Sequence, residues 1–159
     1  MESKIQIQPI GFFHIENHNC FIKINQEYRP GLQNIRGFSH LQIVWWGNLS
    51  DTPAYRARLV ENKPYKKGPD KIGVFATRSQ LRPNPVLITT IAVLKIDEHN
   101  GLISTPYTDA KDGTPVLDIK PYHLFERVKT CRVPQWCSHW PQWYEDAGMF
   151  NWQNEFNFQ

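Results

Sequence analysis

Two segments carry most of the residues whose types could do chemistry. They are G-V-F-A-T-R-S-Q-L-R-P-N-P at 73–85 and D-G-T-P-V-L-D-I-K-P-Y at 112–122. In the first, Arg78 and Arg82 flank a turn that two prolines stiffen. A guanidinium binds carboxylates and phosphates through its planar fork, and a rigid turn loses little entropy on binding. The segment is either an anion-binding loop or a stiff surface turn with solvated arginines.

The second segment begins with a turn at Asp112 and continues as an alternating, extended chain. On a regular strand, Asp118 and Lys120 share one face with Val116, because side chains alternate with a period of two. Asp118 and Lys120 are then either a charge pair on one face of the strand or functional polar groups at the mouth of a barrel.

Positive charge is concentrated in residues 54–82, a stretch that includes most of the first segment. The chain carries a net charge of +3, but residues 54–82 hold eight basic and two acidic residues, so this stretch is +6 and the remainder is −3. Such a patch attracts phosphate-bearing partners, although a solvated lysine-rich loop explains it equally simply. The basic residues are Arg56, Arg58, Lys63, Lys66, Lys67, Lys71, Arg78 and Arg82.

Short β-strands must position these segments. Alternating or β-branched runs, separated by glycine and proline turns, predict strands over Lys4–Ile15 (broken near Pro9), Cys20–Ile24, Phe38–Trp46, Val74–Ala76, Val86–Ile96, Leu102–Thr105 and Thr114–Ile119. A short helix is expected over Thr52–Glu61. This pattern favours an antiparallel barrel or sandwich. The glycine-rich motifs of dinucleotide and P-loop folds, H-E-x-x-H and the nucleophile elbow do not occur.

The tail at 131–159 is rich in aromatic residues. Trp136, Trp140, Trp143 and Tyr144 recur at helical spacing, which predicts one or two short helices laid on the body. A core cap or an oligomer interface is favoured over a platform for stacking bases.

Cysteine usage and apolar runs bear on location. The three cysteines, an odd number without a framework spacing, indicate free thiols in a reducing cytoplasm. Cys131, Cys137 and His139 lack a standard zinc spacing and a fourth ligand, so we expect no metal. We also expect no signal peptide and no membrane-spanning segment.

Three motifs in this order resemble the TrmO family, also called TsaA-like or YaeB-like. They are R-G-F-S-H-L at 36–41 and the two segments at 73–85 and 112–122, and the resemblance covers roughly residues 6–137. The resemblance implies a mainly β fold: a single closed or nearly closed β-barrel with short peripheral helices, forming one domain over 1–159 and usually a homodimer. The tail at 131–159 would pack on the barrel or on a dimer partner.

The resemblance also implies an activity. The family uses S-adenosylmethionine without a Rossmann domain and methylates the exocyclic nitrogen of threonylcarbamoyl-adenosine beside the tRNA anticodon. The expected partner is therefore tRNA, and the expected location is the cytoplasm. Positions that match cofactor-contacting residues are Asn48, Arg78, Ile88, Tyr107, Thr108 and Asp109. Those that match the segment lining the site, where we expect the catalytic groups, are Asp112, Asp118, Lys120 and Tyr122.

Substrate contacts are expected from the arginine turn and the basic patch, at Arg82, Asn84, Arg56, Lys66 and Lys67. Methyl transfer from a sulfonium is an in-line displacement, so the enzyme supplies alignment. A ureido N–H is a poor nucleophile, and Asp112, Asp118 or Tyr122 could assist it as acceptor or base. Arg78, Arg82 or Lys120 could hold a carboxylate or phosphate of the substrate.

The sequence departs from the family at four places. Leu87 stands where the family has glycine, and Tyr107–Lys111 replaces a Leu-Asp-Leu run. The segment after Ile10 and Gly11 is shorter than the usual proline-containing loop, and we expect no counterpart of the C-terminal tRNA-binding domain of larger members. These differences keep two alternatives open: a methyltransferase of a small molecule, and a cofactor-binding protein without turnover.

Overall fold

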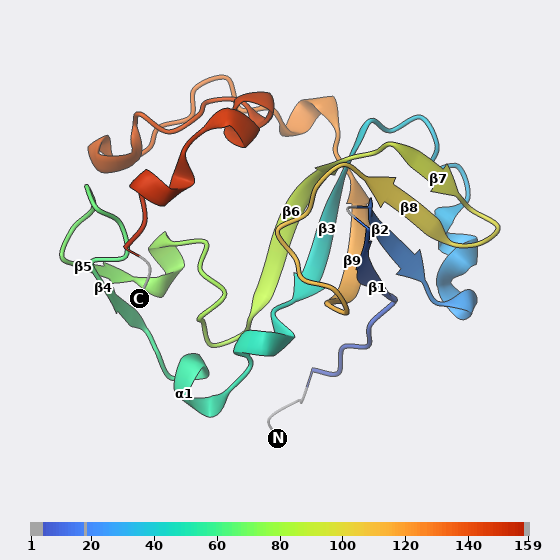
Figure 1. The fold of residues 1–159 in the computed structure, drawn as a ribbon, viewed down its shortest axis with the longest axis horizontal. Coiled ribbons are helices and arrows are strands. Elements are labelled where there is room, and N and C mark those ends of the chain that lie inside the picture. The colour runs from blue at the N-terminus through green and yellow to red at the C-terminus, as the bar shows by residue number, and fades with distance from the viewer. Residues whose placement is uncertain (1–4, 18, 158–159) are drawn as a thin grey trace. The chain divides into compact units, whose positions relative to one another are not determined.

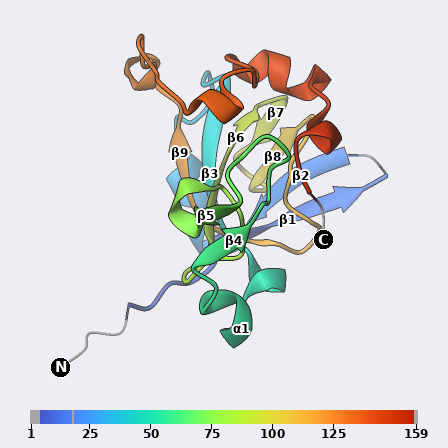
Figure 2. The ribbon, with the colours of Figure 1, turned by 90° about the vertical axis from the view of Figure 1, so that its left-hand side faces the viewer.

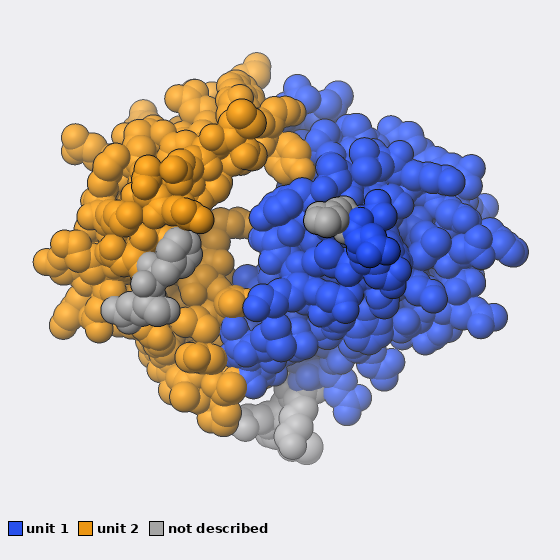
Figure 3. All heavy atoms as spheres, viewed as in Figure 1, with its two compact units in different colours: residues 1–51, 84–127 blue, residues 52–83, 128–159 orange. Residues whose placement is uncertain are grey.

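The computed structural model describes residues 5–17 and 19–157, so the expected strand start at Lys4 lies outside them. The chain forms two compact units, residues 1–51 with 84–127 and residues 52–83 with 128–159 (Figure 3). The first unit holds β1 (Gly11–Glu16), β2 (Asn19–Ile24), η1 (Gln26–Leu32), β3 (His40–Trp46), η2 (Asn48–Ser50), β6 (Val86–Ala92), β7 (Lys95–Asp97), β8 (Leu102–Thr105), β9 (Pro115–Pro121) and η4 (Leu124–Glu126). Each η element is a 3₁₀-helix.

The seven strands of the first unit form one antiparallel sheet in the order β6-β3-β9-β1-β2-β8-β7 (Figure 1). A mainly β fold is therefore confirmed. The predicted barrel is not confirmed, because within the described residues the ladder ends at β6 on one side and β7 on the other. These end strands are consecutive in the chain, and Val93 and Leu94 connect them.

The expected single strand over Val86–Ile96 is therefore two strands. The N–H of Val93 donates to the Ser39 carbonyl beside β3, at 2.9 Å, whereas the N–H of Leu94 donates to the Ser104 carbonyl of β8, also at 2.9 Å. The chain changes partner between these two residues. This change explains why an unbroken apolar run is interrupted in the structure.

One face of the sheet forms the hydrophobic core. Alternate residues of β3 and β6 point inward, among them Leu41, Ile43, Trp45, Leu87 and Ile91. The other core residues are Phe13, Ile22, Ile24, Leu32, Ile103, Ala110 and Val116. Leu87, at the position where the family has glycine, is thus a core residue at 9% exposure.

The second unit contains α1 (Pro53–Arg56), β4 (Val60–Asn62), β5 (Lys71–Gly73), η3 (Val74–Ala76), η5 (Gln135–Cys137), η6 (Tyr144–Met149) and η7 (Trp152–Asn154). The helix α1 and the antiparallel β4–β5 pair are labelled in Figure 2. The predicted helix over Thr52–Glu61 is only α1, which Thr52 caps by accepting from the N–H of Tyr55. The predicted strand Val74–Ala76 is wrong: η3 forms there, and β5 ends at Gly73.

Aromatic residues of the tail form the core of the second unit. Tyr65 stacks on Trp136 at 4.8 Å between ring centroids and meets Trp140 edge-on at 5.4 Å. The remaining members are Phe150, Trp152 and Phe156. Two of the four residues at helical spacing, Trp143 and Tyr144, are exposed, and the tail forms 3₁₀-turns instead of α-helices. The one-domain organisation and the packing of the tail on the barrel or a partner stay predictions.

Candidate functional site

The arginine turn lies in the second unit and is held by its own side chains. Nη2 of Arg82 donates to the carbonyls of Val74 and Thr77, both at 3.0 Å, and the Thr77 hydroxyl donates to the Val74 carbonyl at 2.8 Å. Arg82 is therefore a structural clamp of the turn, and its predicted contact with substrate is untested. Arg78, four residues earlier, has an exposed side chain.

The basic patch is partly neutralised within the second unit. Arg58 pairs with the buried Glu61 at 2.7 Å, and Lys63 pairs with Asp70 at 3.3 Å. Nζ of Lys66 donates to the carbonyl of Gln153 at 3.0 Å, which leaves its charge in place. Nζ of Lys67 lies 3.3 Å from Nε2 of His139. Arg56 is half-buried on α1. The patch therefore offers fewer free charges to a polyanion than its composition suggests.

Asp112 anchors the turn before β9. Its Oδ1 accepts from the N–H of Ile15 at 3.0 Å and lies 4.0 Å from Nδ1 of His14. Gly113 has a φ of +74°, the left-handed conformation that glycine adopts without strain, and its N–H donates to the Phe13 carbonyl at 2.9 Å. The predicted Asp-Gly turn is confirmed, and Asp112 has a structural role there whether or not it is also catalytic.

A β-bulge decides which way β9 presents its side chains. Trp45 pairs with Val116, but Val44 pairs with Asp118, so Leu117 is an extra residue. The bulge shifts the alternation by one. Asp118 and Lys120 therefore face outward, whereas the buried Val116 faces the core. The prediction that all three share one face is wrong, because a regular alternation does not allow for the bulge.

A charge pair, one of the two alternatives for Asp118 and Lys120, forms on this outward face. Nζ of Lys120 lies 2.8 Å from Oδ2 of Asp118. The hydrogen bond and the negative charge of Asp118 raise the pKa of Lys120, so the amine stays protonated at neutral pH. The Asp118 Oδ1 also accepts from the N–H of Ile119 at 2.9 Å. Tyr122 follows directly, half-buried, and its N–H donates to the His40 carbonyl at 3.1 Å.

Ile88 lies on the same outward face. Val44 pairs with Ile88 on one side and with Asp118 on the other, so the three residues form a row across β6, β3 and β9. Neighbouring strands are about 4.8 Å apart, which places Ile88 and Asp118 about 10 Å from each other. This spacing suits a ligand that contacts an apolar and an acidic group at its two ends.

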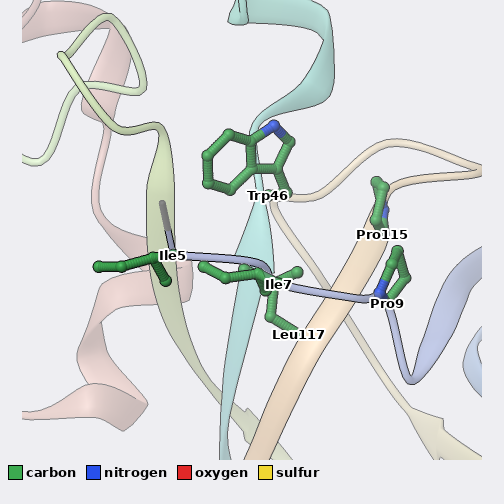
Figure 4. A pocket seen from close by; sticks show the side chains of 6 residues that line it. All are labelled: Ile5, Ile7, Pro9, Trp46, Pro115 and Leu117. Atoms are coloured by element: carbon green, nitrogen blue, oxygen red, sulfur yellow. The ribbon is translucent and has the colours of Figure 1, made fainter. Parts of the chain in front are cut away.

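An apolar groove of about 290 Å³ adjoins this row at one end of the sheet (Figure 4). It is lined by Trp46, Leu117 and Pro115 of the strands and by Ile5, Ile7 and Pro9 of the N-terminal segment. The segment expected to begin the first strand therefore crosses the outward face. This part of the segment is irregular chain, and β1 starts only at Gly11.

Asn48 and Asn84 lie at the same end of β3 and β6. The N–H of Gly47 donates to the Pro85 carbonyl at 2.8 Å, which joins the residues beside the two asparagines. Both side chains are exposed. The structure thus places one expected cofactor residue next to one expected substrate residue.

The loop between β8 and β9 holds the other expected cofactor residues in a defined conformation. The Thr105 hydroxyl donates to the Tyr107 carbonyl at 3.0 Å, and the buried Thr108 accepts from the N–H of Ala110 at 3.1 Å. Asp109 Oδ1 accepts from the hydroxyl of Thr89 in β6, at 2.7 Å. Tyr107 and Asp109 remain exposed, so the loop presents a phenol and a carboxylate to solvent.

Ile88 and Asp109 therefore lie on opposite faces of β6. Ile88 points outward at 49% exposure, whereas the adjacent Thr89, which binds Asp109, points inward. Since β6 is an end strand, a ligand that contacts both must pass around its edge. The sequence motifs predict both residues in one pocket, because the order of motifs along the chain carries no information on strand faces.

The groups of the first unit suit a cofactor that carries an amino acid and a nucleoside. Asp109 can accept from an ammonium or a hydroxyl group, Asn48 and Asn84 can both donate and accept, and Ile88 and Tyr107 offer apolar surface. Sequence reasoning missed Thr89, which fixes Asp109. A threonine between the inward Leu87 and Ile91 is the signal that could have identified it.

Comparison with known proteins decides the family. Residues 3–125 match the family model described as the tRNA-methyltransferase O N-terminal domain, which includes both motif segments. The chain belongs to this family. Members of the TrmO family are S-adenosylmethionine-dependent methyltransferases, so the predicted family, enzyme class and cofactor are confirmed at the family level.

Individual relatives differ in what their names record. A probable S-adenosyl-L-methionine-binding protein of Pyrococcus horikoshii is 40% identical over 116 residues, covering 72% of this chain and 80% of that protein. The tRNA (adenine(37)-N6)-methyltransferase of Escherichia coli is 33% identical over 96 residues, covering 59% of this chain but only 40% of the enzyme.

Solved TrmO structures have the same fold. The crystal structure of TrmO from Pseudomonas aeruginosa aligns with a TM-score of 0.64 and 20% identity, over 85% of this chain and 62% of that one. This chain thus spans less than two thirds of the solved TrmO chain.

Two further findings concern alternatives raised by the sequence. Within 5–17 and 19–157, no group of three or more His, Cys, Asp or Glu side chains is placed to hold a metal ion. Cys137 is buried, and its thiol donates to the Pro134 carbonyl, whereas Cys131 is exposed. No helix among the described residues is both long enough and apolar enough to span a membrane.

Proposed function

We propose that this protein is an S-adenosylmethionine-dependent methyltransferase of tRNA that modifies the exocyclic nitrogen of threonylcarbamoyl-adenosine beside the anticodon. The observation that carries the proposal is the family match over 3–125, which contains both motif segments. The name of the Escherichia coli relative, tRNA (adenine(37)-N6)-methyltransferase, agrees with it. When bound, the cofactor supplies an electrophilic methyl group on its sulfonium.

The residues of the chain can supply what such a transfer needs. The nucleophile is a nitrogen of low basicity, so an acceptor for its proton accelerates attack. Asp118 is our first choice, because it lies on the outward face beside the amine of Lys120, whereas Asp112 anchors the turn before β9 to the backbone of β1. Lys120, protonated beside Asp118, can hold the carboxylate of the threonyl group. Tyr122 follows on the same strand end and serves as the alternative proton acceptor.

The finer assignments rest on the same resemblance. They are a closed or nearly closed barrel, a homodimer, a cytoplasmic location, a cofactor contact at Arg78, and tRNA phosphates held by Arg56, Lys66 and Lys67. Arg82 is a weaker choice for substrate binding, because two carbonyls already accept from Nη2 of its guanidinium.

Calorimetry and a labelled-methyl assay test the proposal together. Calorimetry with S-adenosylhomocysteine should show binding near micromolar affinity. Labelled methyl should enter tRNA that carries threonylcarbamoyl-adenosine, and not tRNA from cells unable to make that modification.

Other outcomes identify the alternatives. Label in both tRNA pools would place the reaction on another nucleoside, and label in small metabolites would identify a small-molecule methyltransferase. Binding without any label would indicate a protein that binds the cofactor without turnover. Absence of binding would overturn the cofactor and with it the activity.

A further inference from the structure

A buried tryptophan of β3 is hydrogen-bonded to a threonine of β6. Trp45 is 6% exposed within the hydrophobic core, and its Nε1–H donates to Oγ1 of Thr89 at 2.9 Å. A buried indole N–H needs a partner, because leaving it unpaired costs free energy. Thr89 is the partner, and it occupies an inward position between Leu87 and Ile91. A valine would fill the same volume there, so the hydroxyl rather than the shape distinguishes this residue.

The same hydroxyl continues to the loop that precedes β9. It donates to Oδ1 of Asp109 at 2.7 Å, a short bond from a neutral donor to a carboxylate. A threonine hydroxyl has a single proton. Because the indole occupies one of its lone pairs, that proton is directed at Asp109. The chain Trp45–Thr89–Asp109 therefore connects a rigid core side chain to an exposed carboxylate.

Asp109 is fixed from both directions. The neighbouring backbone is held by the Thr105–Tyr107 and Thr108–Ala110 hydrogen bonds, and the side chain is held by Thr89. Within the described part of the chain, Oδ1 has this partner, and Oδ2 has no hydrogen-bond partner. A carboxylate with one oxygen tied and the other open accepts donors from one defined direction.

We propose that Thr89, supported by Trp45, is a positioning residue that aims Oδ2 of Asp109 at a hydroxyl or ammonium group of the methyl donor. The inference rests on the proposed function, since it assumes that the loop binds S-adenosylmethionine. Neither Thr89 nor Trp45 contacts the ligand; both act through Asp109. Preorganising an acceptor in this way lowers the entropic cost of binding.

Variants of Thr89 and Asp109 separate positioning from structure. In calorimetry with S-adenosylhomocysteine, Thr89→Val should weaken binding about tenfold, and Thr89→Ser, which keeps the hydroxyl, should bind like the wild type. Asp109→Asn should weaken binding at least as much. In the Asp109→Asn background, adding Thr89→Val should cause no further loss, because the two residues act as one unit.

A second measurement checks the chain without any cofactor. The indole N–H resonance of Trp45 should shift in Thr89→Val and stay in place in Thr89→Ser. A purely structural Thr89 would change the unfolding midpoint without changing the affinity of the folded protein.

Three outcomes would overturn the proposal. They are wild-type affinity in Thr89→Val, a tenfold loss that persists in the Asp109→Asn background, and an unmoved Trp45 resonance in Thr89→Val. Failure of the wild-type protein itself to bind S-adenosylhomocysteine would instead remove the proposed function, and this inference with it.

Discussion

Asp118 and Lys120 form an ion pair of 2.8 Å on the outward face of β9. The bulge at Leu117 places this pair on the face opposite to Val116, which points into the core. In a regular strand that included Leu117 without a bulge, Asp118 and Lys120 would share the face of Val116 and would point into the hydrophobic core. There, two charges would have to be desolvated, which is costly. The bulge therefore allows one strand to bury an apolar residue and expose two charged ones.

Neutralising Asp118 should impair catalysis more than folding. We expect Asp118→Asn to lower kcat for methyl transfer by about a hundredfold, because a proton acceptor in the transition state is lost. The KM for S-adenosylmethionine should change little. The reversed pair, Asp118→Lys with Lys120→Asp, serves as the control: it retains a surface ion pair but should stay inactive. Full turnover in Asp118→Asn would show that the pair is structural.

Truncation of Leu87 should mainly lower the free energy of unfolding, whereas truncation of Ile88 should mainly weaken cofactor binding. Leu87→Ala removes a core side chain and should lower the free energy of unfolding by about 2–4 kcal/mol. Ile88→Ala, at 49% exposure on the other face of β6, should cost less than about 1 kcal/mol but weaken cofactor binding. Urea unfolding and calorimetry measure the two effects. Equal destabilisation by both variants would contradict the assignment of the two faces.

Gly11 is expected to tolerate no side chain. A Cβ there would overlap the carbonyl oxygen of Lys23 on β2, whereas a Cβ at Gly31 would meet nothing within 4 Å. Gly11→Ala should therefore cost about 1–3 kcal/mol through overpacking, and Gly31→Ala should be close to neutral. Thermal unfolding monitored by circular dichroism compares them. A neutral Gly11→Ala would indicate that β1 and β2 can move apart.

The second unit should lose stability in acid through Glu155. Hydrogen bonds from His139 and Trp140 lower the pKa of this buried carboxyl below its ordinary 4.5. A group with a lowered folded-state pKa stabilises the protein above its unfolded-state pKa. The contribution is lost as the pH falls from about 4.5 through the lower value.

Tryptophan fluorescence during acid titration measures this transition, since Trp140 itself donates to Glu155. Glu155→Gln should reduce stability at neutral pH and flatten the dependence on pH below 4.5. Glu145→Gln, at an exposed position on η6, should leave the titration as in the wild type. An unchanged acid transition in Glu155→Gln would assign acid sensitivity to other groups.

Binding of tRNA should depend steeply on salt through the basic residues of the second unit. Each phosphate contact that is lost reduces the slope of log K against log salt by about 1. We expect this reduction in Lys66→Gln. Lys95→Gln, which removes an exposed charge from β7 outside the patch, should leave the slope unchanged. Equal slopes for both variants and the wild type would exclude Lys66 from the tRNA interface.

Local sequence signals predicted several elements correctly. The strands at Cys20–Ile24 and Leu102–Thr105 and the Asp-Gly turn before β9 follow from alternation and turn chemistry, which depend on neighbouring residues. The motifs also identified the family, because the order and spacing of its functional residues are visible without knowledge of the fold.

Tertiary structure alone decided which of those residues lie together. The faces of Asp118 and Ile88 depend on pairing with β3, which is remote in sequence, and one extra residue at Leu117 reverses the alternation. The break at Val93 likewise follows from a change of partner strand, and the bond between Thr89 and Asp109 links β6 to a loop twenty residues later. The sequence by itself determined the family and the residue types of the site. Long-range strand pairing decided how these residues divide between the two faces of one sheet, and local alternation carries no information on that pairing.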